Sequence, residues 1–291
     1  MIRVTQAKSV IHQHNKAFPV MHDLNPYRGC TIGCRYCFAQ YSHHYVGLEN
    51  FFRDIIVKEN AGVCLDNELS KKHKRFQVKI GGVTDAYQPL EKKFGLMPEI
   101  LSVFERHRFP IFISTKSDLI LRDLELIKRL AEVTAVDIAV SISCFDEANA
   151  KIIEPGAATP QKRIDALSQF TDFARSTSIL NMPIIPFISD SPAELENLFA
   201  ASRKARIGNM VSYPLSLRSS QVKQKFFKLV KRNFPMIYND FENMFMRSSS
   251  PDPGYVKGLM QTIGSLREKY ELFDNYSQLE PEIVDEQLSL F

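Results

Sequence analysis

The sequence lacks any apolar run that approaches the roughly 20 residues needed to cross a membrane. Residues 1–20 mix His, Lys and Gln with apolar side chains, so the apolar central region of a secretory signal peptide is also missing. Internal repeats and low-complexity stretches are absent as well. We therefore expect a cytoplasmic protein with no membrane partner.

Cysteine is scarce, with five residues in a chain of 291, and the number is odd. Three of the five fall within eight positions, at Cys30, Cys34 and Cys37. Because disulfides are rare in a reducing compartment, this grouping favours a metal or redox site over a disulfide framework.

Charge of neither sign dominates, since 37 Lys and Arg face 33 Asp and Glu and leave a net charge of +4. This weak bias permits a nucleic-acid partner without requiring one, because a dedicated binding surface needs clustered basic residues. Hydrophobic residues make up 44% of the chain, which is enough for a sizeable core.

Short β-rich runs alternate with longer helical patterns through the middle of the chain. Strands are predicted before Cys30 and at residues 76–81, 110–115, 136–143, 179–185 and 210–215. Helices are predicted at residues 118–133, at 161–176, and from the capping sequence Ser191-Pro192-Ala193-Glu194 to about residue 205. Such alternation implies a parallel sheet, and about six units are too few to close an eight-stranded barrel. We therefore predict an α/β fold, a partial (open) TIM-type barrel of about six β/α units, with its chemistry at the carboxyl ends of the strands.

The alternation stops near residue 219. We assign residues 1–218 to the barrel, including an N-terminal loop that carries the three cysteines, and residues 219–291 to a helical C-terminal extension. A break at 251–254 separates helices rich in Phe, Met and Lys from a further helix that ends near residue 270. The last dozen residues are acidic, and we expect them to be mobile.

Cys30, Cys34 and Cys37 are spaced as C-x3-C-x2-C. Thiolates are soft ligands that suit zinc or an iron–sulfur cluster. A structural zinc site needs four ligands, so His43 or His44 would have to complete a site of three cysteines and one histidine. That zinc site is the main structural alternative.

An iron–sulfur site with four cysteines would need Cys64 or Cys144 in addition, and neither belongs to a compact motif. Three thiolates instead leave one iron of a four-iron cubane open to another ligand. This spacing, with the aromatic Tyr36 before the last cysteine, resembles the radical S-adenosylmethionine (SAM) superfamily.

The resemblance narrows to the spore photoproduct lyase-like branch of that superfamily. The motifs that carry it lie at 25–30 (Asn-Pro-Tyr-Arg-Gly-Cys), 37–40 (Cys-Phe-Ala-Gln) with His43 and Tyr45, 82–91 (Gly-Val-Thr-Asp-Ala-Tyr-Gln-Pro-Leu-Glu), 114–117 (Ser-Thr-Lys-Ser) and 153–156 (Ile-Glu-Pro-Gly) with Arg163. Together they cover roughly residues 23–217, which is most of the predicted barrel.

The resemblance implies that Cys30, Cys34 and Cys37 hold a [4Fe-4S] cluster whose open iron chelates SAM. The rings of Tyr36 and Phe38 are expected to pack around this cofactor. Reduced by an external one-electron donor of flavodoxin or ferredoxin type, such a cluster cleaves SAM to a 5′-deoxyadenosyl radical that abstracts hydrogen from a substrate.

The resemblance indicates the substrate less narrowly than it indicates the cofactor. Because the branch includes DNA photolesion lyases, we expect a lyase-like enzyme that acts on nucleic acid. One alternative is a radical SAM enzyme that acts on a peptide or small molecule. Another is a non-catalytic, zinc-stabilised module that binds the DNA sliding clamp.

Two segments are expected to form the SAM pocket. By resemblance, Gly82, Thr84 and Asp85 meet the methionine amino group, although the same residues would suit a simple strand-to-loop turn. Lys116 ends an apolar strand and can pair with the SAM carboxylate, whereas the alternative is an exposed lysine at the rim.

Ser141 and Ser143 alternate along the next strand and are therefore expected to face the same side. By resemblance, a serine in this region binds the ribose or the methionine end of SAM, but serines also fill tight barrel cores. Arg163 can fork onto a carboxylate, with Glu154 orienting a basic partner, or it can lie on a solvated helix face.

Photolesion lyases need a thiol that donates hydrogen near the substrate. In that family a cysteine lies two residues before a Ser-Asp pair, whereas residues 82–85 of this chain contain none. Cys144 follows the carboxyl end of a predicted strand, so we predict it as the substitute hydrogen donor, with a buried and inert thiol as the alternative.

The end of the chain suggests a further partner. The last five residues combine a polar anchor with spaced apolar side chains, in the order Gln287, Leu288, Ser289, Leu290 and Phe291. This segment resembles the short peptide that bacterial DNA-handling proteins insert into the sliding clamp. A chain end that docks on its own barrel would look similar. A basic run on a predicted helix is compatible with phosphate contacts or with a solvated face, and it comprises Lys223, Lys225, Lys228, Lys231 and Arg232.

Overall fold

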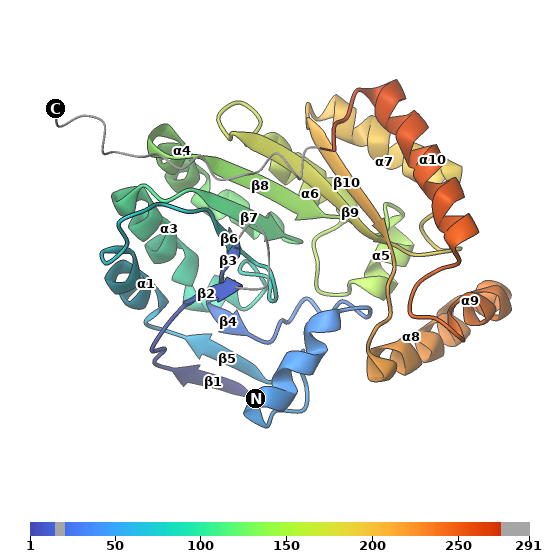
Figure 1. Ribbon diagram of the computed structural model, residues 1–291, viewed down its shortest axis with the longest axis horizontal. Coiled ribbons are helices and arrows are strands. Elements are labelled where there is room, and N and C mark those ends of the chain that lie inside the picture. Colours follow the sequence, from blue (N-terminus) through green and yellow to red (C-terminus); the bar gives the residue numbers. More distant parts are fainter. Residues whose placement is uncertain (15–20, 275–291) are drawn as a thin grey trace.

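A computed structural model describes residues 1–14 and 21–274, and its centre is a seven-stranded sheet (Figure 1). The strand order is β10-β9-β8-β7-β6-β3-β2, and all neighbours from β3 to β10 run parallel. The strands are β2 (Ile11–His14), β3 (Met21–Leu24), β6 (Val78–Ile80), β7 (Ile111–Thr115), β8 (Val136–Ser141), β9 (Ser176–Ile184) and β10 (Asn209–Pro214). β2 adds an antiparallel edge, and among the described residues the sheet does not close on itself. The prediction of an open, partial barrel is therefore confirmed.

A smaller sheet leads the chain into the cysteine loop. It has the order β1-β5-β4 and consists of β1 (Ile2–Thr5), β5 (Ile55–Lys58) and β4 (Tyr27–Arg28). β4 runs antiparallel to β5 and ends just before Cys30. The sequence predicts a strand before Cys30 but not this separate sheet, and β4 has too few positions to show alternation. Its effect is to fix the chain where the three cysteines begin.

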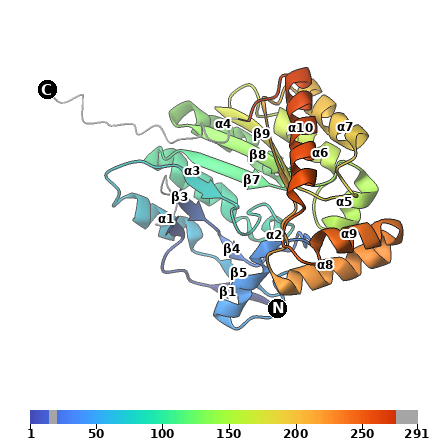
Figure 2. The same ribbon diagram turned by 45° about the vertical axis from the view of Figure 1, so that its right-hand side comes forward.

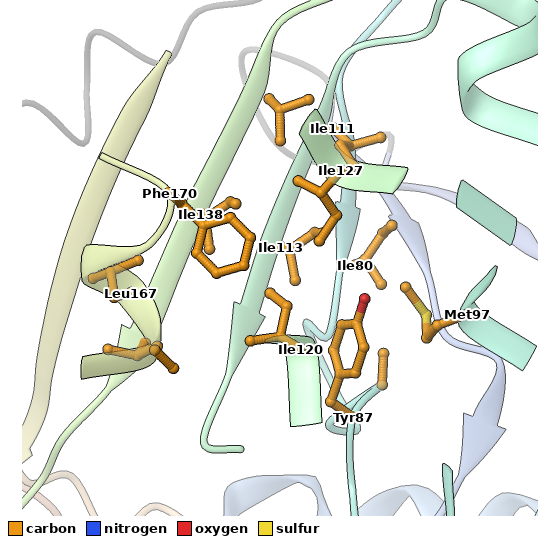
Figure 3. Close-up of a cluster of buried hydrophobic side chains, with 14 of the residues drawn as sticks. Ile80, Tyr87, Met97, Ile111, Ile113, Ile120, Ile127, Ile138, Leu167 and Phe170 are labelled. Carbon is orange, nitrogen blue, oxygen red and sulfur yellow. The ribbon is translucent and has the colours of Figure 1, made fainter. Parts of the chain in front are cut away.

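Helices cover the outer face of the large sheet in both views of the ribbon (Figures 1 and 2). The helices with buried residues in the main core are α1 (Ala61–Leu69), α3 (Leu96–His107), α4 (Leu124–Val133), α6 (Pro160–Ser168) and α7 (Pro192–Lys204). The other helices before the C-terminal segment are α2 (Glu91–Phe94), α5 (Glu147–Ile153) and the 3-10 helices η1 (Phe38–Val46) and η2 (Asp118–Asp123). Ile111 and Ile113 of β7 pack with Ile127 of α4 in the largest apolar cluster (Figure 3). Phe112, which lies between the two strand residues, belongs to a separate small cluster. The main core therefore lies between sheet and helices, and the opposite face of the sheet is left for the site.

The helix predicted over 161–176 is shorter than expected. α6 ends at Ser168, and strand β9 already begins at Ser176. Ser176 pairs with Asp137 of β8, and its hydroxyl donates to the Asp137 carboxylate at 2.9 Å. Pairing with the neighbouring strand therefore overrides the helical pattern of the segment.

Only one of the two hydrogen bonds expected of the capping sequence at the start of α7 is present. The Ser191 hydroxyl accepts the backbone N–H of Glu194 at 3.2 Å, as expected of a helix cap. The Glu194 carboxylate instead accepts the backbone N–H of Phe145 at 2.8 Å. It therefore ties the start of α7 to the loop after β8.

The segment predicted as a C-terminal extension contains α8 (Ser220–Asn233), η3 (Pro235–Ile237), α9 (Tyr238–Phe245) and α10 (Pro253–Tyr270). α10 packs along α7 (Figure 2), whereas α8 and α9 cover a second apolar cluster that includes Ile153 and Ile185. The acidic end of the chain, with the clamp-like residues Gln287 to Phe291, lies outside the described residues. No helix in residues 1–14 and 21–274 has both the length and the apolar content needed to span a membrane.

Candidate active site

A cavity of about 410 Å³ lies at the carboxyl ends of the parallel strands, against the loop of the three cysteines. Its wall also includes the turn after β6 and the ends of β7, β8, β9 and β10. The residues of the predicted site that line it are Cys30, Cys34, Cys37, Tyr36, Phe38, Gly82, Thr84, Asp85, Lys116 and Ser141. Parallel strands bring their carboxyl ends to one edge of a sheet, which is why segments far apart in the sequence meet here.

The cysteine loop is held by the segment that follows α5. The N–H of Arg35 donates to the carbonyl of Ile153 at 2.9 Å, and the N–H of Gly156 donates to the carbonyl of Ile32 at 2.8 Å. A Cβ at Gly156 would lie 2.6 Å from the carbonyl oxygen of Thr31. Only glycine therefore lets the two backbones approach this closely.

The three thiols lie in a buried environment. Cys30 and Cys34 are buried, and Cys37 is half-buried. Burial raises the pKa of the Cys30 thiol to about 12, and the charge of the Asp85 carboxylate adds to this rise. Burial also raises the pKa of Cys34 and of Cys37. In the protein alone the sulfurs therefore remain neutral thiols, and three soft donors on one wall fit a cationic metal cluster that would hold them as thiolates.

The histidines of the zinc alternative lie elsewhere. Nε2 of His43 is 2.7 Å from the carbonyl oxygen of Asp54, and the His43 ring packs edge-on against Phe51, whereas His44 is exposed. Within the part of the chain that the structure describes, no three Cys, His, Asp or Glu side chains are close enough to share one metal ion. Thiolates of a four-iron cluster each bind a different iron, so they do not need that close approach.

Asp85 joins the turn after β6 to the end of β7. Its carboxylate accepts the Thr115 hydroxyl at 2.7 Å, the Lys116 N–H at 2.7 Å and the Tyr87 N–H at 2.9 Å. Burial raises the pKa of Asp85, and these hydrogen bonds oppose the rise. The turn begins at Gly81, whose φ of +92° lies in the left-handed region that favours glycine. This geometry matches the strand-to-loop alternative and also leaves Asp85 on the cavity wall.

Gly82 and Thr84 reach the cavity through a turn that Asn25 organises. The side-chain oxygen of Asn25 accepts the N–H groups of Val83 and Thr84, both at 3.2 Å. The Thr84 hydroxyl donates to the carbonyl of Tyr27 at 3.2 Å. The side chain of Thr84 therefore serves the turn itself, and no sequence pattern predicted the part played by Asn25.

Glu154 is a buried carboxylate behind the cavity wall on which three side chains meet. Arg163 donates to Glu154 Oε2 at 2.7 Å and to the carbonyl of Ser141 at 2.6 Å. The Lys116 ammonium lies 3.8 Å from Glu154 Oε1, and the Tyr36 hydroxyl donates to the same oxygen. Burial raises the pKa of Glu154, but the charges of Arg163 and Lys116 and the hydrogen bonds outweigh it and leave the pKa below its ordinary value. The charged carboxylate thus links the cysteine loop, β7 and the end of β8.

Three predicted site residues do not line the cavity. Arg163 is buried and touches the site through Glu154, so it does not lie on a solvated helix face. β8 ends at Ser141, and the alternation does not extend to the fully buried Ser143. Cys144 packs in the apolar cluster under α8 and α9, where burial raises its pKa. The prediction that Cys144 points to the cavity mouth is therefore wrong, because the regular strand has already ended at Ser141.

Gln88 is a site residue whose role no sequence pattern predicted. Its side-chain oxygen accepts the N–H of Thr31 at 2.8 Å, and its side-chain nitrogen donates to the carbonyl of Gly29 at 3.2 Å. This buried amide therefore holds the cysteine loop from the β6 side. Its only signal was its place in the 82–91 motif, because a side chain that bridges two loops leaves no local periodicity.

Comparison with known proteins gives relatives that match most of the chain. An uncharacterised protein of Mycobacterium tuberculosis is 30% identical over 283 residues, which cover 94% of this chain and 83% of that protein. A protein of Pseudomonas phage M6, named a radical SAM Nalpha-GlyT isomerase, is 26% identical over 188 residues, which cover 63% of this chain and 37% of that protein.

A solved structure shares the fold. A mutant spore photoproduct lyase with bound AdoMet and dinucleoside spore photoproduct matches with a TM-score of 0.64, over 92% of this chain and 78% of that chain, at 11% identity. At this identity the match shows the fold alone. The family model described as the radical SAM superfamily matches residues 24–199, which is more than half of the sequence. The chain therefore belongs to the radical SAM superfamily.

Proposed function

We propose that the protein is a radical SAM enzyme that holds a [4Fe-4S] cluster on Cys30, Cys34 and Cys37 and cleaves SAM in the adjoining cavity. The observation that carries the proposal is the position of three thiols, two of them buried and one half-buried, on one wall of the cavity at the strand ends. When bound, the cluster and SAM supply hydrogen-atom abstraction by a 5′-deoxyadenosyl radical. Membership of the superfamily and AdoMet in the related lyase structure support the assignment.

The residues of the chain bind and orient SAM in this proposal. The cavity volume of about 410 Å³ lies within the range of about 300–1,000 Å³ that is common for small-molecule sites. The ammonium of Lys116 pairs with the methionine carboxylate, and Glu154 holds that ammonium from behind. The absence of a side chain at Gly82 lets the backbone approach the ligand closely. Leu180 and Met182 of β9 form an apolar part of the wall that excludes water.

We further propose nucleic acid as the substrate, with a DNA lesion lyase-like reaction. Support comes from the fold shared with a lyase whose solved structure contains a dinucleoside. Because Cys144 lies in an apolar cluster outside the cavity, it is no longer the proposed hydrogen donor. Since the phage relative is named an isomerase, analysis of the nucleoside products is needed to separate a lyase outcome from an isomerase outcome.

Anaerobic purification with iron and sulfide reconstitution tests the radical SAM assignment. We expect a brown protein with about four iron atoms per chain that forms 5′-deoxyadenosine from SAM under dithionite. Cys34→Ala should lose both properties. Cys64→Ala is the matched control, because Cys64 lies in α1 away from the cavity, and it should retain both. A colourless wild type with one zinc per chain would contradict the proposal.

Two partners remain part of the proposal. The one-electron donor is of flavodoxin or ferredoxin type, and SAM cleavage should proceed when such a donor replaces dithionite. The last five residues, Gln287 to Phe291, bind the sliding clamp. Their deletion should eliminate clamp affinity and leave SAM cleavage unchanged, and unchanged clamp affinity would contradict this partner.

A further inference from the structure

The mouth of the cavity is flanked by two segments that carry positive charge and no acidic residue. Residues 24–48 contain the cysteine loop and η1, and residues 215–239 start at the cavity wall and contain α8. Together they hold eight of the 37 Lys and Arg and none of the 33 Asp and Glu. The rest of the chain holds 29 Lys and Arg against 33 acidic residues, a net charge of −4. These two segments therefore carry a local excess of positive charge.

Both segments lie at the end of the sheet to which the parallel strands point. Figures 1 and 2 show η1, the blue helix near the N-terminus, and the orange α8 beyond the arrowheads of the strands. Tyr36 of the cysteine loop also packs against the apolar cluster that α8 covers. The two elements therefore border the same region of the surface.

α8 presents its basic side to solvent. Its apolar residues Val222, Phe226 and Val230 are buried at helical spacing in the cluster below. Lys225 and Lys228 are exposed, and neither takes part in an ion pair with a carboxylate of the described residues. Two such ammonium groups can contact phosphate groups without losing an existing carboxylate partner.

η1 carries a row of exposed aromatic rings that starts at the cavity. Phe38 lines the cavity, and Phe38, Tyr41 and Tyr45 are 59%, 48% and 77% exposed. The ring centroids of Phe38 and Tyr41 are 6.4 Å apart in a stacked arrangement, and those of Tyr41 and Tyr45 are 6.1 Å apart edge to face. A contiguous exposed group of large apolar rings marks an interaction surface, and rings of this kind stack with nucleic-acid bases.

We propose that this aromatic row and α8 form the docking surface for single-stranded DNA. Bases stack on Phe38, Tyr41 and Tyr45, and phosphates contact Lys225 and Lys228. The inference rests on the proposed nucleic-acid substrate and adds the form in which the strand binds. Enzymes that act on a base need it outside the duplex stack, and Phe38 at the cavity wall is placed to guide such a nucleotide inward.

Fluorescence anisotropy with a labelled oligothymidylate of about 12 nucleotides tests the surface, using the reconstituted full-length protein. We expect Tyr45→Ala to raise the Kd about fivefold or more and to leave the salt dependence unchanged, because it removes stacking and no charge. We expect the double variant Lys225→Gln/Lys228→Gln to lower the slope of log Kd against log salt by about 1.4, for two lost phosphate contacts.

Matched controls lie away from this end of the sheet. Phe273→Ala removes a ring that is 60% exposed near the start of β10, and Lys71→Gln/Lys72→Gln removes two exposed lysines beyond α1. Both controls should bind the oligonucleotide as the wild type does. The iron content of every variant is measured to show that it is folded and loaded.

The outcomes separate this inference from the proposed function. If the wild type binds the oligonucleotide and Tyr45→Ala and the lysine variant bind it equally well, the surface is wrong and the proposed function stands. Tighter binding of an oligouridylate than of the oligothymidylate also overturns the inference. So does the finding that Tyr45→Ala and the lysine variant lose affinity for the electron-donor protein but keep their affinity for DNA. If the wild type cleaves SAM and binds no DNA, both the surface and the nucleic-acid substrate are wrong, while the radical SAM assignment stands.

Discussion

At each end of the seven-stranded sheet a buried carboxylate pairs with an arginine. The two ends differ in the other side chains that this carboxylate binds. At the amino end, Asp137 of β8 accepts Nε of Arg175 at 3.0 Å, the Gln77 amide at 2.6 Å and the Ser176 hydroxyl at 2.9 Å. Those partners stand at the starts of β6 and β9. At the carboxyl end, Glu154 joins an arginine to a lysine and a tyrosine that line the cavity.

The comparison separates stability from function in this fold. Asp137 and its partners hold strands in register at the amino end of the sheet, and none of them lines the cavity among the described residues. Glu154 holds strand ends together as well, but two of its partners belong to the proposed cofactor pocket. Substitution at the amino end should therefore change the free energy of unfolding alone, whereas substitution of Glu154 should change both stability and cofactor binding.

The largest effect is expected for Glu154→Gln. The buried Arg163 loses its counter-charge, so the free energy of unfolding should fall by about 3–5 kcal/mol, measured by urea denaturation of the protein without cofactors. The affinity of the reconstituted variant for SAM should also fall, because the Lys116 ammonium loses its anchor. Unchanged SAM affinity in a folded, iron-loaded variant would contradict the proposed role of Glu154.

Asp137→Asn should have a smaller effect that is confined to stability. Arg175 is 29% exposed, so water can solvate it after the loss of its partner, and we expect a decrease of about 2 kcal/mol. SAM affinity and iron content should equal those of the wild type. A decrease in SAM affinity as large as that of Glu154→Gln would remove the distinction between the two ends.

Substitution of two glycines by alanine should have opposite effects on the free energy of unfolding. Gly156→Ala forces a Cβ against backbone atoms of the cysteine loop, so we expect a loss of about 1–3 kcal/mol and a lower iron content after reconstitution. Gly258→Ala, in the open surroundings of α10, should gain about 0.5–1 kcal/mol and keep its iron. Equal iron content in the two variants would show that the close approach at Gly156 does not shape the loop.

The smallest expected effect is the pH dependence of the stability that Glu154 contributes. Because the pKa of Glu154 is lowered by folding, its contribution to stability is complete above the unfolded pKa of about 4.3 and is lost as pH falls through the lower folded pKa. The difference in unfolding free energy between wild type and Glu154→Gln should therefore be constant from about pH 7 to pH 5 and shrink in more acidic solution. Asp85 is present in both proteins, so its raised pKa cancels in the difference. A difference that stays constant in acid would contradict the ion pair.

The order of the barrel elements could be predicted because each β/α unit leaves its own local pattern. An apolar strand such as 111–115 and the amphipathic helix that follows it differ in period, and the structure places both near their predicted bounds. The end of α6 and the two-residue strand β4 could not be predicted. Both are decided by a partner distant in the sequence, Asp137 in the first case and β5 in the second.

The wall of the site was predictable where a residue ends a strand or belongs to a spaced motif. Lys116 follows β7, and the C-x3-C-x2-C spacing marks the cysteine loop. The positions of Cys144 and Gln88 were not predictable in this way. Once a strand has ended, the direction of a side chain depends on where the chain turns next, and a bridging amide depends on two loops at once.

The bond between Tyr36 and Glu154 joins residues that are 118 positions apart in the chain, and this separation has a consequence for biosynthesis. At a synthesis rate of about 5–20 residues per second, the cysteines are made on the order of ten seconds before the segment that holds their loop. During that interval the thiols belong to an unfinished domain, are open to solvent and have no cavity around them. The proposed cluster should therefore be loaded after the segment around Glu154 has been made and has packed on the cysteine loop.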